Sequence, residues 1–121
     1  MESELVARLR LAFAVLDGKK AYHVLVLDVA DRTSIAEAFV ICSVGSQRQA
    51  QAVADEVDRV LAAAGARTLS VEGYAQGGWI LMDYGDFVLH IFLEERREYF
   101  ALERLWGDAP EVTALLRPTG T

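Results

Sequence analysis

The first residues whose types and spacing suggest chemistry are Gly45 and Ser46, which follow a predicted strand and open a predicted helix. Backbone N–H groups at a helix N-terminus bind phosphate, and nucleotidyltransferases use a strand, a Gly-Ser pair and a helix in this way. Their chemistry also needs two close carboxylates on the next strand to hold metal ions. The next predicted strand, residues 67–72, carries no such pair. The sequence therefore favours Ser46 as a helix N-cap, and a nucleotidyltransferase-like enzyme is the less favoured alternative.

A second candidate is the group of polar residues around a predicted hairpin turn. Asp83 and Asp86 flank this turn, but two carboxylates without other oxygen ligands make a poor cation site, and aspartate is common in turns. His90 lies diagonally across the predicted ladder from Asp83, where an Asp–His pair could form. Acid–base or nucleophilic chemistry would need a third group that the sequence does not place there. We therefore expect a structural histidine, and no catalytic residue, metal or cofactor.

Length and composition indicate one acidic globular domain. The chain has 121 residues, of which 53% are hydrophobic and 25% charged, which excludes a disordered or low-complexity segment. Twelve Lys and Arg residues against eighteen Asp and Glu residues give a net charge of −6. Because this charge repels phosphate, we expect no direct nucleic-acid groove, and a basic protein partner fits better.

The same sequence bears on the cellular compartment. Cys42 is the only cysteine and lies inside an apolar segment, so we expect a buried, unreactive thiol and a reducing environment. Residues 1–4 are acidic and do not resemble the positive start of a signal peptide. Since no apolar run approaches the roughly 20 residues that a membrane span needs, we expect a cytoplasmic protein without membrane partners.

Hydrophobic periodicity divides the chain into elements in the order α-β-β-α-β-β-β-α. Helices are predicted over residues 4–16 with Ser3 as N-cap, over 46–64 with a capping box at Ser46 and Gln49 and a stop at Gly65, and over 94–106. Strands are predicted over 22–29, 38–44, 67–72, 79–84 and 87–92. The nearly continuous apolar runs at 22–29 and 38–44 are typical of central strands. The expected fold class is α/β, with a mixed sheet of about five strands flanked by helices.

The two strands over 79–84 and 87–92 are joined by Gly85 and Asp86, a connector typical of a primed hairpin turn. This loop length fixes the register and therefore the face on which each side chain lies. The pairs Tyr84–Phe87, Met82–Leu89 and Ile80–Ile91 are predicted to face the core. The opposite face, with the pairs Asp83–Val88, Leu81–His90 and Trp79–Phe92, is more mixed and therefore more informative about function.

Aromatic residues are the remaining signal. Trp79 begins a strand after a glycine-rich loop, and Trp106 ends the last predicted helix near Tyr99. Such residues combine a large apolar area with a polar group and are frequent at protein interfaces. Packing within the chain is the equally weighted alternative at each position. Since catalytic machinery is missing from the sequence pattern, these residues favour a binding protein over an enzyme.

Ordered short motifs lie at residues 28–36, 39–43, 46–49, 54–57, 71–73, 79–86, 90 and 102–110. Together they resemble the ribosomal silencing factor family (Iojap-like, RsfS). The resemblance implies a nucleotidyltransferase-like fold without the catalytic carboxylates and without transferase activity. It also implies a translational repressor that binds the large ribosomal subunit, chiefly large-subunit ribosomal protein fourteen, and blocks joining of the small subunit under nutrient limitation. A role in maturation of the large subunit is the alternative.

The resemblance also implies which residues bind the ribosomal protein. On the predicted hairpin they are Trp79, Asp83, Tyr84 and Asp86, and on the last predicted helix they are Tyr99, Leu102, Leu105 and Trp106. Trp79 is expected to be an anchor, with Asp83 or Asp86 as a charge contact. The resemblance makes residues 1–110 a single silencing-factor domain and residues 111–121 a variable C-terminal tail. A homodimer is a further possibility within the family.

Overall fold

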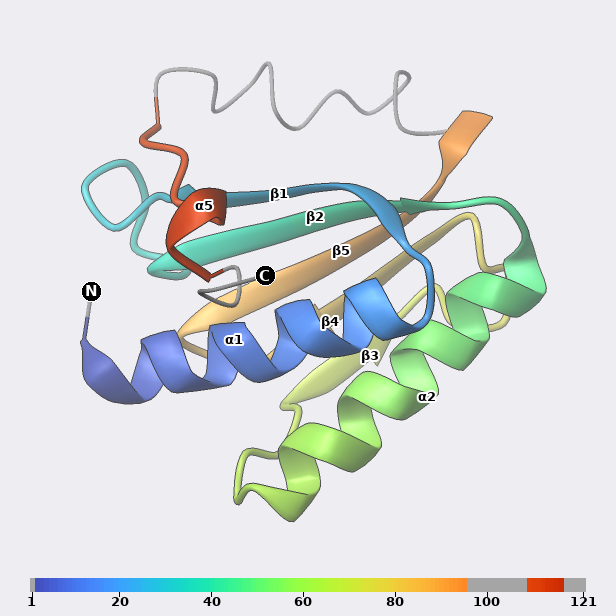
Figure 1. The fold of residues 1–121 in the computed structure, drawn as a ribbon, viewed down its shortest axis with the longest axis horizontal. Coiled ribbons are helices and arrows are strands. Elements are labelled where there is room, and N and C mark those ends of the chain that lie inside the picture. The colour runs from blue at the N-terminus through green and yellow to red at the C-terminus, as the bar shows by residue number, and fades with distance from the viewer. Residues whose placement is uncertain (1, 96–108, 117–121) are drawn as a thin grey trace.

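A computed structural model describes residues 2–95 and 109–116 of the chain. Its five-stranded sheet has the order β1-β2-β5-β4-β3. The central strands β2 and β5 are parallel, and all other neighbours are antiparallel. The fold is therefore mixed α/β with a mixed sheet, as predicted. The elements in Figure 1 are α1 (Ser3–Gly18), β1 (Tyr22–Asp28), β2 (Ala38–Val44), α2 (Gln47–Ala63), β3 (Ser70–Glu72), β4 (Trp79–Asp83), β5 (Phe87–Leu93) and α5 (Thr113–Leu116).

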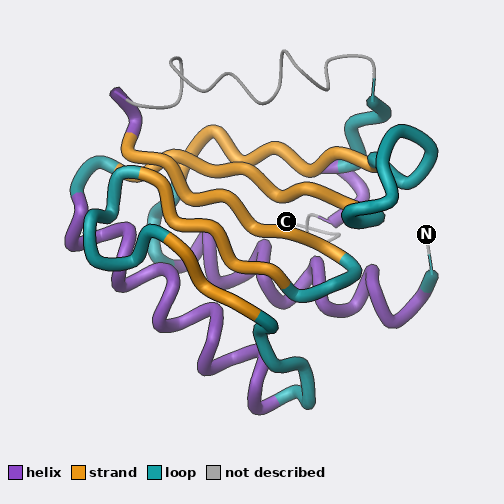
Figure 2. Tube along the Cα trace, turned by 180° about the vertical axis from the view of Figure 1, so that it is seen from behind, coloured by secondary structure: helices purple, strands orange, loops and turns teal. Residues whose placement is uncertain are grey.

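Helices α1 and α2 lie together on one face of the sheet, as the views from the two sides show (Figures 1 and 2). Between them and the sheet lies the larger hydrophobic core, to which every second residue of β2, β4 and β5 contributes. Each large apolar side chain buried there contributes about 1.5–3 kcal/mol. Among the described helices, none is both long enough and apolar enough to cross a membrane. The largest fully buried side chains of this core include Leu5, Leu9, Leu16, Leu61, Ile80, Met82, Phe87, Leu89 and Ile91.

The opposite face of the sheet carries a second apolar cluster. Trp79 and Leu81 are partly buried against it. Since α1 and α2 lie on the other side, this face is the one from which the hairpin presents its mixed set of side chains. The buried members of the cluster are Leu27, Val29, Ala36, Phe39, Ile41, Val88, Phe92 and Ala109.

The helix signals in the sequence are confirmed for α2 and partly wrong for α1. Ser46 caps α2, since its hydroxyl accepts a hydrogen bond of 3.0 Å from Gln49 N–H. Gly65 ends the helix with φ +90°, a conformation that glycine adopts readily. The N-cap of α1 is Glu2 and not Ser3, because the Glu2 carboxylate accepts from Glu4 N–H at 3.0 Å.

Two strand predictions also need correction. The strand predicted over 67–72 is shorter, since β3 covers only Ser70–Glu72. Just before it, the Asp83 carbonyl accepts from Leu69 N–H at 2.7 Å and from the Thr68 hydroxyl at 3.1 Å. β2 is central and buried throughout, as expected, but β1 lies at the edge of the sheet. The helix predicted over 94–106 begins with Glu94 and Glu95, and from residue 96 onward it lies outside the described residues.

The apolar sequence of β1 does not indicate an edge strand, because residues 110–113 run along the outer side of β1 and cover it. Asp28 N–H donates to the Pro110 carbonyl at 2.8 Å, and Val112 N–H donates to the Val26 carbonyl at 2.9 Å. Val26 N–H in turn donates to the Thr113 hydroxyl at 2.9 Å. These bonds satisfy backbone groups that an open edge would leave unpaired, so an apolar edge strand is tolerated. That residues 111–121 vary between family members stays a prediction.

Ending the chain after Pro110 should lower its stability, because Val112, Thr113 and the buried Leu116 are removed. Hydrogen bonds of about 1 kcal/mol each and a leucine of about 1.5–3 kcal/mol give an expected loss of roughly 3–5 kcal/mol. The control ends after Leu116 and keeps these contacts. Urea titrations of the two truncated chains measure the difference, and equal unfolding midpoints would contradict this role for residues 111–116.

Candidate functional site

The candidate site is the β4–β5 hairpin, and its register is the one that the turn predicts. Trp79 pairs with Phe92, Leu81 with His90, and Asp83 with Val88. Gly85 adopts φ +87°, which the tight turn requires and which other residues adopt only with strain. Successive side chains point to opposite faces of a strand, so Trp79, Leu81, Asp83 and His90 share one face of the sheet.

Trp79 is held on this face by contacts of two kinds. Its ring stacks on Phe92, with ring centroids 5.1 Å apart and planes 22° apart. Its indole Nε1–H donates a hydrogen bond of 3.1 Å to His90 Nδ1. The side chain is therefore half-buried and oriented within the chain, and is not a freely rotating surface aromatic.

His90 is the buried polar residue of the site. Only 5% of its surface is exposed, and its ring forms a T-shaped contact with the ring of Phe39 at a centroid distance of 5.3 Å. Burial lowers the pKa of His90 to about 4, so the ring is neutral near pH 7. Since Nδ1 accepts the Trp79 bond, the proton is assigned to Nε2, which is buried and has no hydrogen-bond partner among the described residues.

The Asp–His pair considered from the sequence is not formed. His90 bonds to Trp79, and Asp83 Oδ1 accepts from Gly85 N–H at 2.8 Å within its own turn. Within residues 2–95 and 109–116, no group of three or more His, Cys, Asp or Glu side chains is arranged to hold a metal ion. The described part of the site therefore offers a surface for contact and not an acid–base pair.

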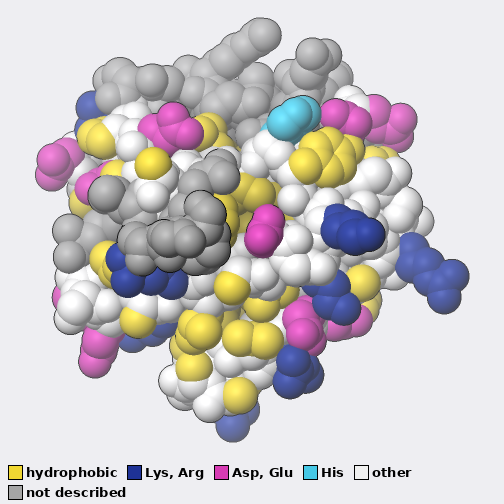
Figure 3. Space-filling view, viewed as in Figure 1, with side chains coloured by type: hydrophobic (Ala, Val, Ile, Leu, Met, Phe, Trp, Pro, Cys, Tyr) yellow, Lys and Arg dark blue, Asp and Glu magenta, His cyan; other side chains and the backbone are white. Residues whose placement is uncertain are grey.

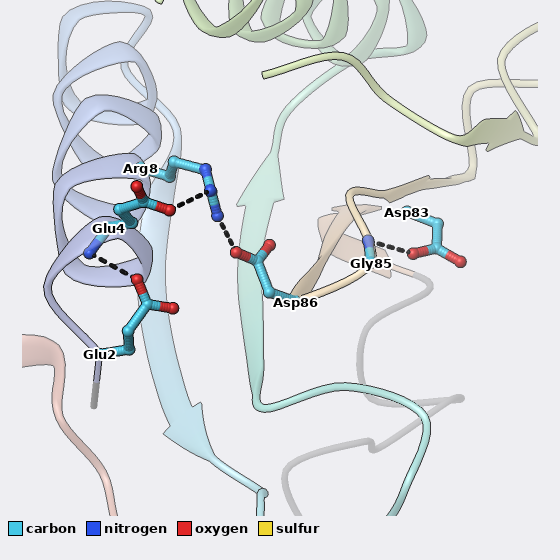
Figure 4. Close-up of polar contacts among 6 residues, drawn as sticks. All are labelled: Glu2, Glu4, Arg8, Asp83, Gly85 and Asp86. Atoms are coloured by element: carbon cyan, nitrogen blue, oxygen red, sulfur yellow. Dashed lines mark hydrogen bonds and ion pairs between the residues drawn. The ribbon is translucent and has the colours of Figure 1, made fainter. Parts of the chain in front are cut away.

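The two aspartates of the hairpin turn have different surroundings (Figure 4). Asp86 forms an ion pair with Arg8 of α1, and Arg8 also lies 3.3 Å from Glu4. The Asp86 backbone carbonyl accepts from Glu37 N–H at 2.9 Å, so this residue ties α1 and the start of β2 to the hairpin. Asp83 points to the other side of the turn, and no cation among the described residues forms an ion pair with it.

Tyr84 lies in the core, as its register predicts. It is 9% exposed, and its ring stacks on Phe87 with centroids 4.9 Å apart. Burial, with a smaller contribution from the charge of Asp58, raises the pKa of the Tyr84 phenol to about 12. Its position corrects the expectation that Tyr84 contacts a partner, because the side chain is enclosed by its own chain. The other expected contact residues, Tyr99, Leu102, Leu105 and Trp106, lie outside the described residues.

The glycine-rich loop before Trp79 is positioned by contacts that the sequence analysis missed. Gln47 Nε2 donates to the Ala75 carbonyl at 2.6 Å, which ties the loop to the start of α2. Gly73 has φ +79°, and a Cβ there would lie 2.0 Å from the Trp79 carbonyl oxygen. A Cβ on Gly77 would lie 2.3 Å from Gln47 Cγ. The loop conformation that delivers Trp79 to β4 therefore depends on glycine at these positions.

At the N-terminus of α2, considered above as an anion site, two backbone N–H groups are bonded within the chain. Gly45 N–H donates to Gln49 Oε1 at 2.8 Å, and Gln49 N–H donates to Ser46. The hollow beside it is lined by Gly45, Leu93, Glu94 and Glu95. Two carboxylates next to this helix end repel phosphate, so the local charge disfavours a nucleotide.

The buried histidine should make stability depend on pH. Because the pKa of His90 falls from 6.5 to about 4 on folding, the unfolded chain binds more protons between these values, and stability is lost as pH falls through this window. From pH 7 to pH 5 the expected loss is about 2 kcal/mol. His90→Asn removes the titrating ring and should remove this part of the pH dependence in urea titrations. His23→Asn, at the exposed histidine, is the control, and equal pH dependence in wild type and His90→Asn would contradict the assignment.

Comparison with known proteins places the chain in a family. The model of the family described as "Ribosomal silencing factor during starvation" matches residues 2–119. The ribosomal silencing factor RsfS of Halalkalibacterium halodurans is 43% identical over 104 residues, which is 86% of this chain and 89% of that protein. A crystal structure of a Chromobacterium violaceum protein has a TM-score of 0.81 and 34% identity, covering 88% of both chains.

A more distant relative, the mouse protein named "Mitochondrial assembly of ribosomal large subunit protein 1", is 28% identical over 96 residues, which is 77% of this chain and 42% of that protein. The family match covers nearly the whole sequence, and the structural match covers 88% of the chain. The chain belongs to the ribosomal silencing factor family.

Proposed function

We propose that this chain binds the large ribosomal subunit, chiefly through large-subunit ribosomal protein fourteen, and thereby blocks joining of the small subunit. Protein synthesis would fall as a result under nutrient limitation, and the site of action would be the cytoplasm. The observation that carries the proposal is the match of residues 2–119 to a family described as silencing factors during starvation. The action is steric, so it needs a docking surface and no chemical step.

The hairpin face is the proposed docking surface, here defined as Trp79, Leu81 and Asp83 of β4. Trp79 supplies a large, oriented aromatic surface, and residues of this kind dominate binding energy at interfaces. Asp83 supplies a negative charge that no described cation pairs with. Asp86 is instead paired with Arg8, so of the two aspartates Asp83 is the better candidate for a contact with a basic partner.

Charge supports a protein partner over a nucleic acid. The net charge of −6 favours approach to a basic protein and opposes approach to a phosphate backbone. On the face that carries α1 and α2, the described basic side chains are interspersed with acidic ones and form no continuous stripe (Figure 3). A basic protein partner therefore fits best, because this chain offers it an acidic surface with an aromatic anchor.

We propose that no reaction accompanies binding. Two N–H groups at the start of α2, those of Gly45 and Gln49, are bonded within the chain, and the adjacent hollow is acidic, which argues against a nucleotide substrate. The contacts of Tyr99, Leu102, Leu105 and Trp106 with the ribosomal protein, and a homodimer, stay predictions from the family resemblance.

Maturation of the large subunit is the second candidate function. It is favoured by the name of the mouse relative, which describes assembly of the large subunit. Both functions would use the same surface, because both require binding to the large subunit. They differ in the step that the chain would affect in cells. For maturation this step is the appearance of complete large subunits, and for silencing it is the pairing of large with small subunits.

Co-sedimentation of the purified chain with separated ribosomal subunits tests the proposal. We expect the chain to sediment with large subunits and not with small ones. Binding to neither subunit would overturn the proposal, and binding to small subunits alone would place the partner elsewhere.

Trp79→Ala should weaken binding to large subunits by about 30-fold or more, as expected for an aromatic anchor worth about 2 kcal/mol or more. The control is Tyr74→Ala, which removes a 39% exposed aromatic from the loop on the α2 side. Tyr74→Ala should bind as the wild type does. Fluorescence-labelled chain titrated with large subunits measures both, and equal affinities of the two variants would remove Trp79 as the anchor.

Asp83→Asn and Asp86→Asn should separate binding from stability. Asp83→Asn keeps an oxygen for the Gly85 N–H bond and removes the charge, so affinity should fall about 3- to 10-fold at low salt with little change in stability. Asp86→Asn breaks the half-buried pair with Arg8, so stability should fall by about 1 kcal/mol with affinity retained. The same titrations and urea unfolding measure both effects, and the reverse pattern would make Asp86 the contact residue.

A further inference from the structure

We propose that His90 is a positioning residue for Trp79: its Nδ1 selects the orientation in which the indole ring meets the ribosomal protein. This inference rests on the proposed function of the hairpin face. The observation that carries it is the 3.1 Å hydrogen bond from Trp79 Nε1 to His90 Nδ1, made on the same sheet face as the stacking contact with Phe92.

Stacking alone does not fix the indole. Rotation of the indole by 180° about the Cβ–Cγ bond keeps its plane stacked on Phe92. The same rotation moves Nε1 to the place that the opposite edge of the ring held before. Only one of these two orientations brings the N–H to His90. The indole nitrogen is a donor only, so the bond requires an acceptor at this position, and that is what His90 Nδ1 supplies.

His90 is itself held in place by its two neighbouring strands and by two aromatic rings. Its backbone lies in the centre of the sheet, paired with Ile41 of β2 and Leu81 of β4. Its ring is enclosed by Phe39 at 5.3 Å and Phe92 at 6.2 Å between centroids. Burial among these rings keeps the imidazole neutral near pH 7, which preserves the acceptor lone pair on Nδ1. The acceptor is therefore a rigid part of the core that reaches the docking surface.

The expected consequence is preorganisation. A partner that binds an already oriented tryptophan does not have to order that side chain on binding, and ordering one such side chain corresponds to about a 3- to 10-fold change in affinity. Loss of the His90 acceptor should therefore weaken binding by that factor, less than loss of the Trp79 ring itself.

The matched variants are His90→Asn and His90→Leu, which are close in size. The Asn side-chain oxygen stands near the position of Nδ1 and can accept the indole N–H, whereas Leu offers no acceptor. We expect His90→Leu to bind large subunits about 3- to 10-fold more weakly than wild type, and His90→Asn to bind within about 2-fold of it. Equal weakening by both variants would show a packing role only and would overturn the inference, as would wild-type affinity of His90→Leu.

The NMR resonance of the Trp79 indole N–H gives a spectroscopic test of the same bond. In ¹H–¹⁵N spectra, the Trp79 indole resonance, assigned by its absence in Trp79→Phe, should shift and exchange faster in His90→Leu but not in His90→Asn.

The variant Trp79→Phe tests the donor of the bond. It keeps an aromatic ring without the N–H and should bind about 3- to 10-fold more weakly than wild type, with no further loss on adding His90→Leu. This variant decides the question if His90→Leu does not fold, and wild-type affinity of Trp79→Phe would overturn the inference.

Failure of the inference is distinguishable from failure of the proposed function. If Trp79→Ala loses binding while His90→Leu binds as wild type, the docking surface stands and the positioning role falls. If Trp79→Ala also binds as wild type, the hairpin face is not the docking surface and both fall.

Discussion

The register of the β4–β5 hairpin decides which side chains reach each face of the sheet. Gly85 allows the tight turn, and the ion pair between Asp86 and Arg8 ties that turn to α1. A slip by one residue would move Met82 out of the core and turn Trp79 and Asp83 into it. The larger core and the candidate docking surface therefore depend on the same short turn.

Polar groups at the start of α2 serve the fold. The Ser46 hydroxyl accepts from Gln49 N–H, the Gln49 side chain accepts from Gly45 N–H, and Gln47 ties the glycine-rich loop to the same helix end. This loop then delivers Trp79 to β4 with its backbone orientation set. The N-terminus of α2 thus helps to place an aromatic side chain.

Local signals were sufficient for most of the fold. The hairpin register, the Ser46 cap, the Gly65 stop and the buried Cys42 follow from neighbouring residues, and each is confirmed. The edge position of β1 could not be predicted, because the segment that shields it lies more than 80 residues later along the chain, as the Val26–Thr113 bond shows. The Trp79–His90 contact could have been predicted, since the predicted register already made these residues diagonal neighbours. The sequence does not show which imidazole nitrogen accepts the indole N–H.

The most direct test of the central claim is a subunit-joining titration. Large subunits are incubated with increasing amounts of the chain, small subunits are added, and complete ribosomes are quantified on a sucrose gradient. The account predicts that complete ribosomes decrease with chain concentration, with a midpoint that matches the affinity for large subunits, and that Trp79→Ala shifts this midpoint upward. Undiminished joining at saturating occupancy of large subunits would contradict steric silencing and would leave maturation of the large subunit as the function of this surface.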